Sequence, residues 1–162
     1  MDYIDRVRVQ WAEVLPDVDT SPADVGARVR RIAALLEAAM ADDLAASGVS
    51  RAEVDVLTAL RRAGRPLRAG EITTMTGSPG ASITKRLDRL AGAGLVERAV
   101  PERDRRGVVV ALTPAGEDLV DDVFPRQVER ERAATADLSA AERAELGRLL
   151  AVVLRGLDPR DY

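Results

Sequence analysis

The chain has 162 residues, a net charge of −3, and neither cysteine nor histidine. This length suits one domain with a hydrophobic core, or one intertwined fold. The missing residue types exclude disulfides and thiol redox chemistry, and they remove the two best transition-metal ligands and the usual general base. We therefore expect no metal ion, no cofactor and no enzymatic activity.

The N-terminal region predicts two helices. Residues 2–15 place apolar residues at helical spacing, and Pro16 ends the run. The same residues carry acids where a signal peptide would have a basic start, and no apolar run reaches membrane-spanning length, so we expect a cytoplasmic chain without a membrane partner. A second helix begins with Ser21 as N-cap and Pro22 at the first position, and Gly48 ends it. The two apolar stripes are Ile4, Val7, Trp11 and Val14, and then Val25, Val29, Ile32, Leu36 and Met40.

The middle of the chain predicts three more helices. Arg51–Ala63 is closed by Gly64, and the short helix Ala69–Thr76 ends at Gly77. Ser78 and Pro79 then open a helix that runs through GASITKRLDRLAGAG, with the serine as its cap. In the first two of these helices the side chains expected to be buried are Val54, Leu57, Leu60, Ile72 and Met75.

Two strand-like runs, Val96–Val100 and Val108–Thr113, follow and predict a hairpin. Two helices joined by a tight glycine-containing turn and followed directly by a hairpin indicate a winged helix-turn-helix. Residues 115–134 are again helical, and Pro125 predicts a kink or a break within them. Ser139 and Glu142 predict a capping box for the last helix, whose apolar stripe is Leu146, Leu149, Leu150, Val153 and Leu154.

The predicted fold is mainly α with a small β-wing: a winged helix-turn-helix plus a helical dimerisation region. We assign residues 1–48 and 115–162 to dimerisation helices, and residues 49–114 to the DNA-binding lobe. The flanking helices would expose their apolar stripes in a lone chain, so a symmetric homodimer is expected. A monomer whose terminal helices pack on the middle is the alternative.

Basic residues concentrate in the predicted lobe. Residues 61–107 hold eleven arginines and lysines against five acids, a balance of +6, whereas the rest of the chain holds 13 basic and 22 acidic residues, a balance of −9. This distribution predicts a surface that binds an anion, although an ordinary arginine-rich surface gives the same count.

One face of the third middle helix has the pattern of a recognition helix. At about 100° per residue, Ile83, Leu87 and Leu90 form a buried edge, and small or polar residues occupy the rest. Short side chains let a helix enter the major groove, where hydroxyls and lysine reach base edges or phosphates. A plain solvated face is the alternative, and the adjacent basic hairpin favours DNA. The predicted contacts on and beside this helix are Ser78, Ala81, Ser82, Thr84, Lys85 and Arg89.

The hairpin tip, PERDRRG at residues 101–107, holds three arginines and two acids. Arginine suits a narrow minor groove, where the negative potential is enhanced. We expect Arg105, and next Arg103, to enter that groove, while Asp104 and Arg106 brace the loop by an ion pair. Arg106 is counted with the other two arginines among the DNA-binding residues of the wing.

These residues resemble the multiple-antibiotic-resistance-regulator (MarR) family. The motifs RLDRL, GLVER, DRR and LTPAG occur in this order at the family's spacing, and the helical frame extends the resemblance over nearly the whole chain. The resemblance implies a homodimer on a pseudo-palindromic operator that represses transcription until a small ligand weakens binding.

A finer resemblance is to the urate-responsive members of that family. Their tryptophan, acid and two arginines correspond to Trp11, Asp55, Arg86 and Arg98, which would bind an anionic planar ligand. Each residue also has another explanation. Trp11 could be a core residue, and Asp55 could simply pair with an arginine. Arg86 could contact a phosphate, and Arg98 could be a residue common to all such wings.

The sequence therefore predicts a DNA-binding transcriptional regulator with a small anionic effector, urate or a related purine. Two alternatives remain open at this point. The regulator could sense a different anion or none, or the chain could be a dimeric helical interaction module whose wing binds an acidic protein.

Overall fold

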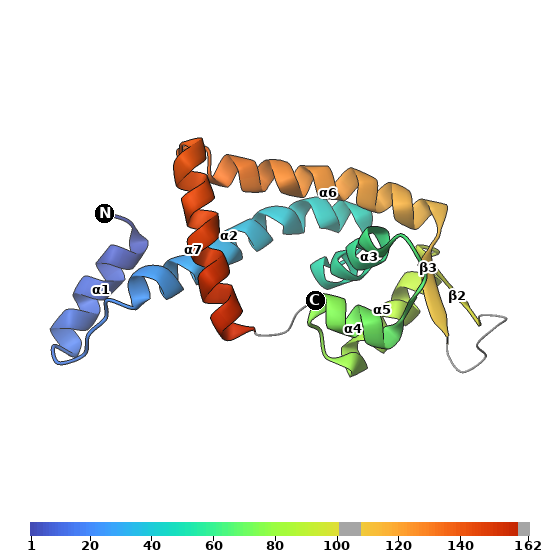
Figure 1. The fold of residues 1–162 in the computed structure, drawn as a ribbon, viewed down its shortest axis with the longest axis horizontal. Helices are drawn as coiled ribbons and strands as arrows, with labels where there is room; N and C mark the ends of the chain where they lie inside the picture. The colour runs from blue at the N-terminus through green and yellow to red at the C-terminus, as the bar shows by residue number, and fades with distance from the viewer. Residues whose placement is uncertain (101–107, 159–162) are drawn as a thin grey trace. The chain divides into compact units, whose positions relative to one another are not determined.

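The structure, a computed structural model, describes residues 1–100 and 108–158, except for the side chains at positions 42, 43, 45 and 46. The described chain is mostly helical with one small antiparallel sheet, which confirms the predicted fold class. It forms two compact units, residues 1–48 and residues 49–162 (Figure 1). None of the helices in the described part is both long enough and apolar enough to cross a membrane.

The first unit consists of α1 (Tyr3–Val14) and α2 (Ala23–Ser47), which an ionic cluster joins. Arg28 Nε donates to Asp2 Oδ2 at 2.7 Å, and Arg28 Nη2 donates to Asp5 Oδ1 at 2.5 Å. Asp2 and Asp5 also accept each other's backbone N–H. These backbone bonds, followed by Arg28, hold the pKa of both carboxyls below their ordinary values. The ion pairs of Asp2 and Asp5 with Arg28, which join the two helices, therefore persist to a lower pH than those of ordinary aspartates would.

Most apolar side chains of this unit lie on its surface. Within the described part of residues 1–48, only Ile4, Met40 and Leu44 are buried hydrophobic residues. The helix α2 begins at Ala23, and the hydroxyl of Ser21, predicted as its cap, donates to Asp19 at 2.9 Å. The exposed large apolar residues from the two predicted stripes are Trp11, Val14, Val25, Val29 and Ile32.

The second unit contains the predicted helix-turn-helix. Its elements are α3 (Arg51–Ala63), β1 (Leu67–Arg68), α4 (Ala69–Thr76), α5 (Gly80–Gly92), β2 (Val96–Ala99), β3 (Val109–Leu112), α6 (Pro114–Ala134) and α7 (Ala140–Leu157). Gly64 and Gly77 end α3 and α4 in the left-handed backbone conformation, as the sequence predicts. Met75 is only half-buried, whereas Ile72 is fully enclosed. The core of this unit is formed by Val56, Leu57, Leu67, Ile72, Ile83, Leu90 and Val110.

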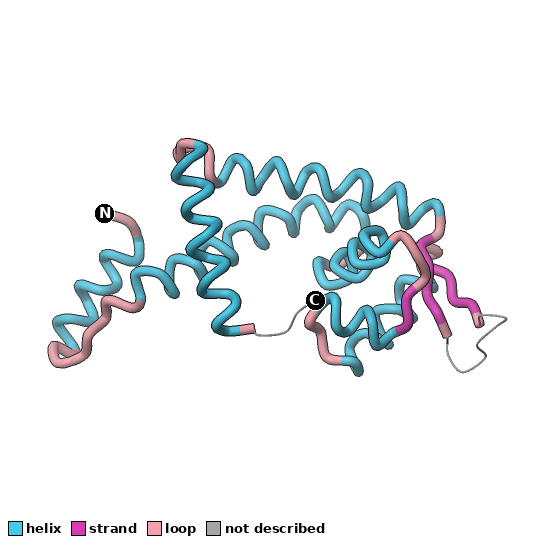
Figure 2. Tube along the Cα trace, viewed as in Figure 1, coloured by secondary structure: helices cyan, strands magenta, loops and turns pink. Residues whose placement is uncertain are grey.

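Figure 2 shows the strands in magenta. They form a sheet in the order β1-β3-β2, with both pairs antiparallel. The predicted hairpin is present: Val96 pairs with Leu112, and Ala99 pairs with Val109. The short strand β1, which the sequence analysis missed, pairs Leu67 with Val110. It thereby attaches the chain segment between α3 and α4 to the first half of β3, at Val109 and Val110.

A close backbone approach fixes the start of α6. Thr113 caps this helix by accepting the N–H of Gly116 at 3.1 Å, and its hydroxyl donates to the carbonyl of Gly94 at 2.7 Å. A Cβ atom on Gly116 would lie 2.1 Å from the carbonyl oxygen of Leu95. The last glycine of the LTPAG motif is therefore required by packing, because only hydrogen fits between α6 and the residue that precedes β2.

The two C-terminal helices agree with the predicted boundaries. The helix α6 continues through Pro125 without a break. The predicted capping box of α7 is present, since Glu142 Oε2 accepts both the backbone N–H and the hydroxyl of Ser139. No described residue of α7 is buried, and its whole predicted stripe, from Leu146 to Leu154, lies at the surface.

We expect Gly116→Ala to lower the free energy of unfolding by about 2 kcal/mol or more, because the added methyl group must push two backbone segments apart. Urea denaturation followed by circular dichroism measures this loss. The matched control is Gly70→Ala in α4, where an added Cβ meets nothing within 4 Å. That variant should be as stable as the parent or slightly more so. Equal stability of Gly116→Ala and the parent would contradict the packing argument.

Candidate nucleic-acid interface

The helix α5 is divided into a buried edge and an exposed face, as its periodicity predicts. Ile83, Leu87 and Leu90 are almost fully buried. On the other side, Ala81, Thr84, Lys85 and Arg89 are exposed, and Ser82 is half-buried with its hydroxyl donating to the carbonyl of Pro79 at 2.6 Å. The buried edge fixes the rotation of the helix about its own axis, so the short and polar side chains face outward.

Ser78 has a different position from the one predicted. The helix α5 begins at Gly80 with Pro79 as its N-cap residue, so Ser78 does not cap it. Its hydroxyl instead accepts a hydrogen bond from Arg86 Nη1 at 2.8 Å. The physical reason is the length of the arginine, which reaches back two turns along α5 to the preceding loop. The bond ties that loop to the middle of the helix.

The hairpin is tied to α5 by an ion pair. Arg98 Nη2 on β2 lies 2.7 Å from Asp88 Oδ1 on α5. Both side chains are partly exposed, so this pair contributes little stability by itself. It does set the direction of both charged groups. The three predicted wing-tip contacts, Arg103, Arg105 and Arg106, lie outside the described residues.

A third polar contact joins α5 to α3. Glu53 is 2% exposed, and its Oε1 lies 3.3 Å from Arg89 Nε. Its other oxygen, Oε2, accepts the backbone N–H and the hydroxyl of Ser50, forming a capping box at the start of α3. The spacing of Ser50 and Glu53 carries the capping-box pattern, so sequence reasoning could have found the cap. The ion pair with Arg89 depends on tertiary packing and has no such sequence pattern.

The four predicted ligand residues come from different places. Asp55 on α3 pairs with Arg51 at 3.0 Å and lines a cavity of about 320 Å³ with Thr58, Arg62 and Met75. Arg86 and Arg98 have the partners just described, Ser78 and Asp88. Trp11 belongs to the first unit and is 50% exposed. Asp55, Arg86 and Arg98 thus share one unit, and each is held by a contact within the chain.

Ion pairs also frame the lobe away from α5. Arg61 Nη2 on α3 lies 2.7 Å from Asp121 Oδ2 on α6, and this bond holds the pKa of Asp121 below its ordinary value. Arg65 and then the backbone N–H of Arg68 lower the pKa of Glu71 in the same way. Since the carboxylates of Asp121 and Glu71 are ionised at neutral pH, both ion pairs keep their charges in that pH range.

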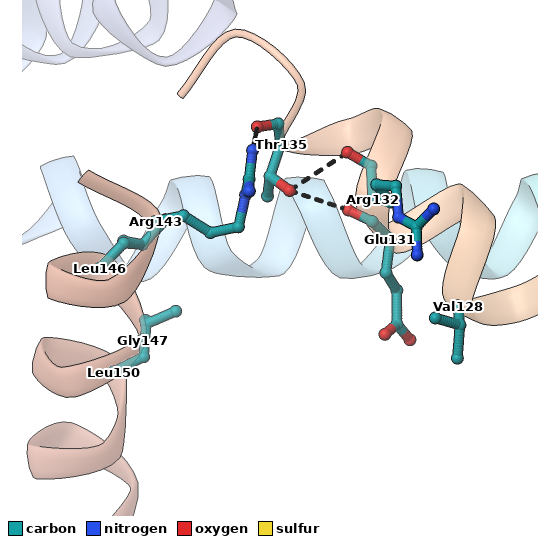
Figure 3. A pocket seen from close by; sticks show the side chains of 8 residues that line it. All are labelled: Val128, Glu131, Arg132, Thr135, Arg143, Leu146, Gly147 and Leu150. Atoms are coloured by element: carbon teal, nitrogen blue, oxygen red, sulfur yellow. Dashed lines mark hydrogen bonds between the residues drawn. The ribbon is translucent and has the colours of Figure 1, made fainter. Parts of the chain in front are cut away.

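An open groove of about 430 Å³ lies between α6 and α7 (Figure 3). Arg143 Nη2 donates to the carbonyls of Thr135 and Leu138, at 3.1 and 3.0 Å, and so holds the turn between the helices. Three apolar side chains line the groove, Val128, Leu146 and Leu150. No group of three or more aspartates and glutamates among the described residues could hold a metal ion.

Comparison with known proteins decides between the classes that the residues left open. A model of the MarR family matches residues 47–107, which include all of α3, α4 and α5. The HTH-type transcriptional regulator PecS of Dickeya dadantii is 33% identical over 150 residues, which cover 91% of this chain and 90% of PecS. The chain belongs to the MarR family. It is therefore a DNA-binding transcriptional regulator, and the comparisons support this class rather than the interaction module.

Solved structures of MarR-family proteins support this assignment. A mutant of MarR from E. coli in complex with operator DNA has a TM-score of 0.71 at 26% identity, with 89% of this chain and 97% of that chain covered. BpsR of Bordetella bronchiseptica, whose DNA binding is regulated by 6-hydroxynicotinic acid, has a TM-score of 0.69 at 28% identity, with 80% and 98% covered. The MarR fold therefore extends beyond the segment that the family model matches.

Proposed function

We propose that the chain is a homodimeric repressor that binds a pseudo-palindromic operator and leaves it when a small anion binds. The observation that carries the proposal is the exposed face of α5, where Ala81 and Lys85 lie opposite the buried edge and Thr84 lies beside them. Small side chains there allow close approach to base edges, and the helix lies in the basic part of the chain.

Within this proposal, two groups of residues contact DNA differently. Ala81, Ser82, Thr84 and Lys85 reach base edges in the major groove, where the methyl group of alanine meets thymine methyl groups. Arg89 and the hydroxyl of Ser78 contact the phosphate backbone beside them; a hydroxyl that accepts one bond, as Ser78 does from Arg86, can still donate another. The wing-tip arginines, Arg105 first, enter the neighbouring minor groove.

We expect Lys85→Ala to weaken operator binding by about 1–3 kcal/mol more than binding to an unrelated duplex, because it removes a base contact. Arg105→Ala should weaken binding to both duplexes similarly and reduce the salt dependence, because it removes mainly charge. The measurement is a titration of operator fragments, selected from genomic DNA, at several salt concentrations. Arg126→Ala on α6 is the control and should change neither affinity. Equal losses on both duplexes for Lys85→Ala would mean that another face reads the sequence.

The homodimer is proposed from the apolar surface that the described helices leave uncovered. Leu149, Val153 and Leu154 on α7 are 48%, 47% and 63% exposed, and the groove beside α6 opens next to them. The exposed apolar residues of α1 and α2 add a second such surface in the other unit. A monomeric protein rarely leaves rows of large apolar side chains exposed, and self-association through a two-fold axis would cover them.

We expect the full chain to sediment as a dimer at micromolar concentration. Leu149→Glu together with Val153→Glu should shift it toward the monomer, because association would then bury two carboxylates per protomer in the apolar surface of α7. The double variant Glu145→Gln and Arg148→Gln, on the same helix, is the control and should remain dimeric, because those two residues already pair with each other on the surface. Sedimentation of the unmodified chain as a monomer would overturn the proposed architecture.

The proposed effector is urate or a related purine, bound by Arg86, Arg98, Asp55 and Trp11. Two guanidinium groups suit an anion, and an indole suits the face of a flat ring. The ligand must compete with Ser78 for Arg86 and with Asp88 for Arg98. Losing these contacts releases α5 from the preceding loop and from β2. Since two half-sites must fit major grooves about 34 Å apart, a small rotation of each α5 lowers operator affinity.

We expect urate, in a titration of the protein–operator complex, to quench the fluorescence of Trp11 and to release DNA. Xanthine, citrate and 6-hydroxynicotinic acid, the regulator of BpsR, test other anions. Arg86→Ala should abolish release by urate, and Trp11→Phe should weaken it. If no anion acts at millimolar concentration, the chain has another effector or none. If urate acts equally on both variants, the pocket lies elsewhere. A ligand must prefer the DNA-free form to act at all.

A further inference from the structure

The acid Glu53 has a role that the capping of α3 does not explain. Among the residues that the structure describes, it is the one charged residue that is buried, at 2% exposure. A capping box works with glutamate or with glutamine, because it needs only an oxygen that accepts the N-cap backbone N–H. Removing a charge from water is costly unless a partner compensates for it. The carboxylate charge of Glu53 therefore requires a reason beyond the cap.

The second oxygen of the Glu53 carboxylate explains why a charged residue is needed, because it faces an arginine. While Glu53 Oε2 accepts the N–H and hydroxyl of Ser50 at 2.7 and 2.8 Å, Oε1 faces Arg89 Nε at 3.3 Å. Neither oxygen can turn away without giving up a partner. The first turn of α3 thus holds the carboxylate in a fixed orientation, and the carboxylate in turn holds the arginine of α5.

The two side chains of this pair differ in their contact with water. The side chain of Glu53 is 3% exposed, whereas that of Arg89 is 66% exposed. The contact uses Nε, the guanidinium nitrogen next to the aliphatic stem, so it restrains the guanidinium group at its base. Arg89 lies one helical turn after Lys85, on the exposed face of α5. A planar guanidinium group restrained at its base has fewer orientations than a mobile one.

We propose that Glu53 is a positioning residue that aims Arg89 at one phosphate beside the bases read by α5. This inference rests on the proposed role of α5 in DNA binding. An oriented arginine loses less rotamer freedom on binding than a mobile one, provided that the phosphate lies where the arginine points. The operator in its correct register meets this condition. A misaligned or unrelated duplex does not, so Glu53 raises the preference for the operator rather than the affinity for DNA in general.

The test compares Glu53→Gln with the control Ser50→Ala on operator and unrelated duplexes of equal length. Glu53→Gln keeps the cap but turns an amide toward Arg89, so we expect the preference for the operator to fall by roughly tenfold. Binding to the unrelated duplex should stay equal or rise slightly, because Arg89 keeps its charge. Ser50→Ala removes the hydroxyl of the cap and leaves the carboxylate facing Arg89. It should lower the melting temperature and leave the preference within about twofold.

Two variants of Arg89 complete the test. Arg89→Lys keeps the charge without the fork and should reproduce the loss of preference in a normally folded protein. In an Arg89→Gln background, Glu53→Gln should cause no further loss, because the residue that it positions is gone. The inference is overturned if Glu53→Gln weakens both duplexes equally, or if its effect is unchanged in the Arg89→Gln background. If the unmodified protein binds the operator no better than the unrelated duplex, the proposed function of α5 is refuted instead. That measurement is made on the unmodified protein, so it separates the two outcomes.

Discussion

The burial of one edge of α5 is the constraint on which the DNA-binding lobe depends. Ile83, Leu87 and Leu90 pack within the core that α3, α4 and β2 complete, and all three are nearly inaccessible to water. Because these residues recur at helical spacing, their burial sets which side chains point outward. Apolar contacts are not directional, however. They fix the rotation of α5 about its axis more firmly than they fix its position along the core.

Three polar contacts supply the direction that the apolar edge lacks. Arg86 reaches Ser78 in the preceding loop, Asp88 pairs with Arg98 on β2, and Arg89 meets Glu53 on α3. The three residues of α5 lie within one turn, and they connect it to three different parts of the lobe. Two of these contacts involve the arginines proposed to bind the effector, whereas the third is separate from them. Binding of the proposed effector would therefore release α5 from the preceding loop and from the hairpin, while the contact with Glu53 keeps it attached to α3.

Sequence reasoning predicted the parts of this arrangement that depend on local pattern. The glycine ends of α3 and α4, the buried edge of α5 and the capping box of α7 follow from backbone conformation and periodicity over a few residues. It failed where a distant residue competes for a side chain. Ser78 is predicted to cap α5, but the N-cap residue is Pro79, and the hydroxyl of Ser78 accepts a hydrogen bond from Arg86. The strand β1 has only two residues, which is too short to show the alternation typical of a strand. It forms because Leu67 and Arg68 pair with Val110 and Val109 on β3.

The pair Asp88–Arg98 links this geometry to electrostatics. Asp88 is an acid on the face of a helix proposed to approach phosphates, and Arg98 at 2.7 Å compensates for its charge. If an anionic ligand draws Arg98 away, the carboxylate of Asp88 faces the DNA without its partner, and like charges repel more strongly where water is excluded. Release from the operator then has two causes: the displacement of α5, and the repulsion between the unpaired carboxylate of Asp88 and the phosphates. The second needs no movement of the backbone. Because the acid remains beside any duplex, it also weakens binding to DNA of unrelated sequence, which a change in half-site spacing alone does not.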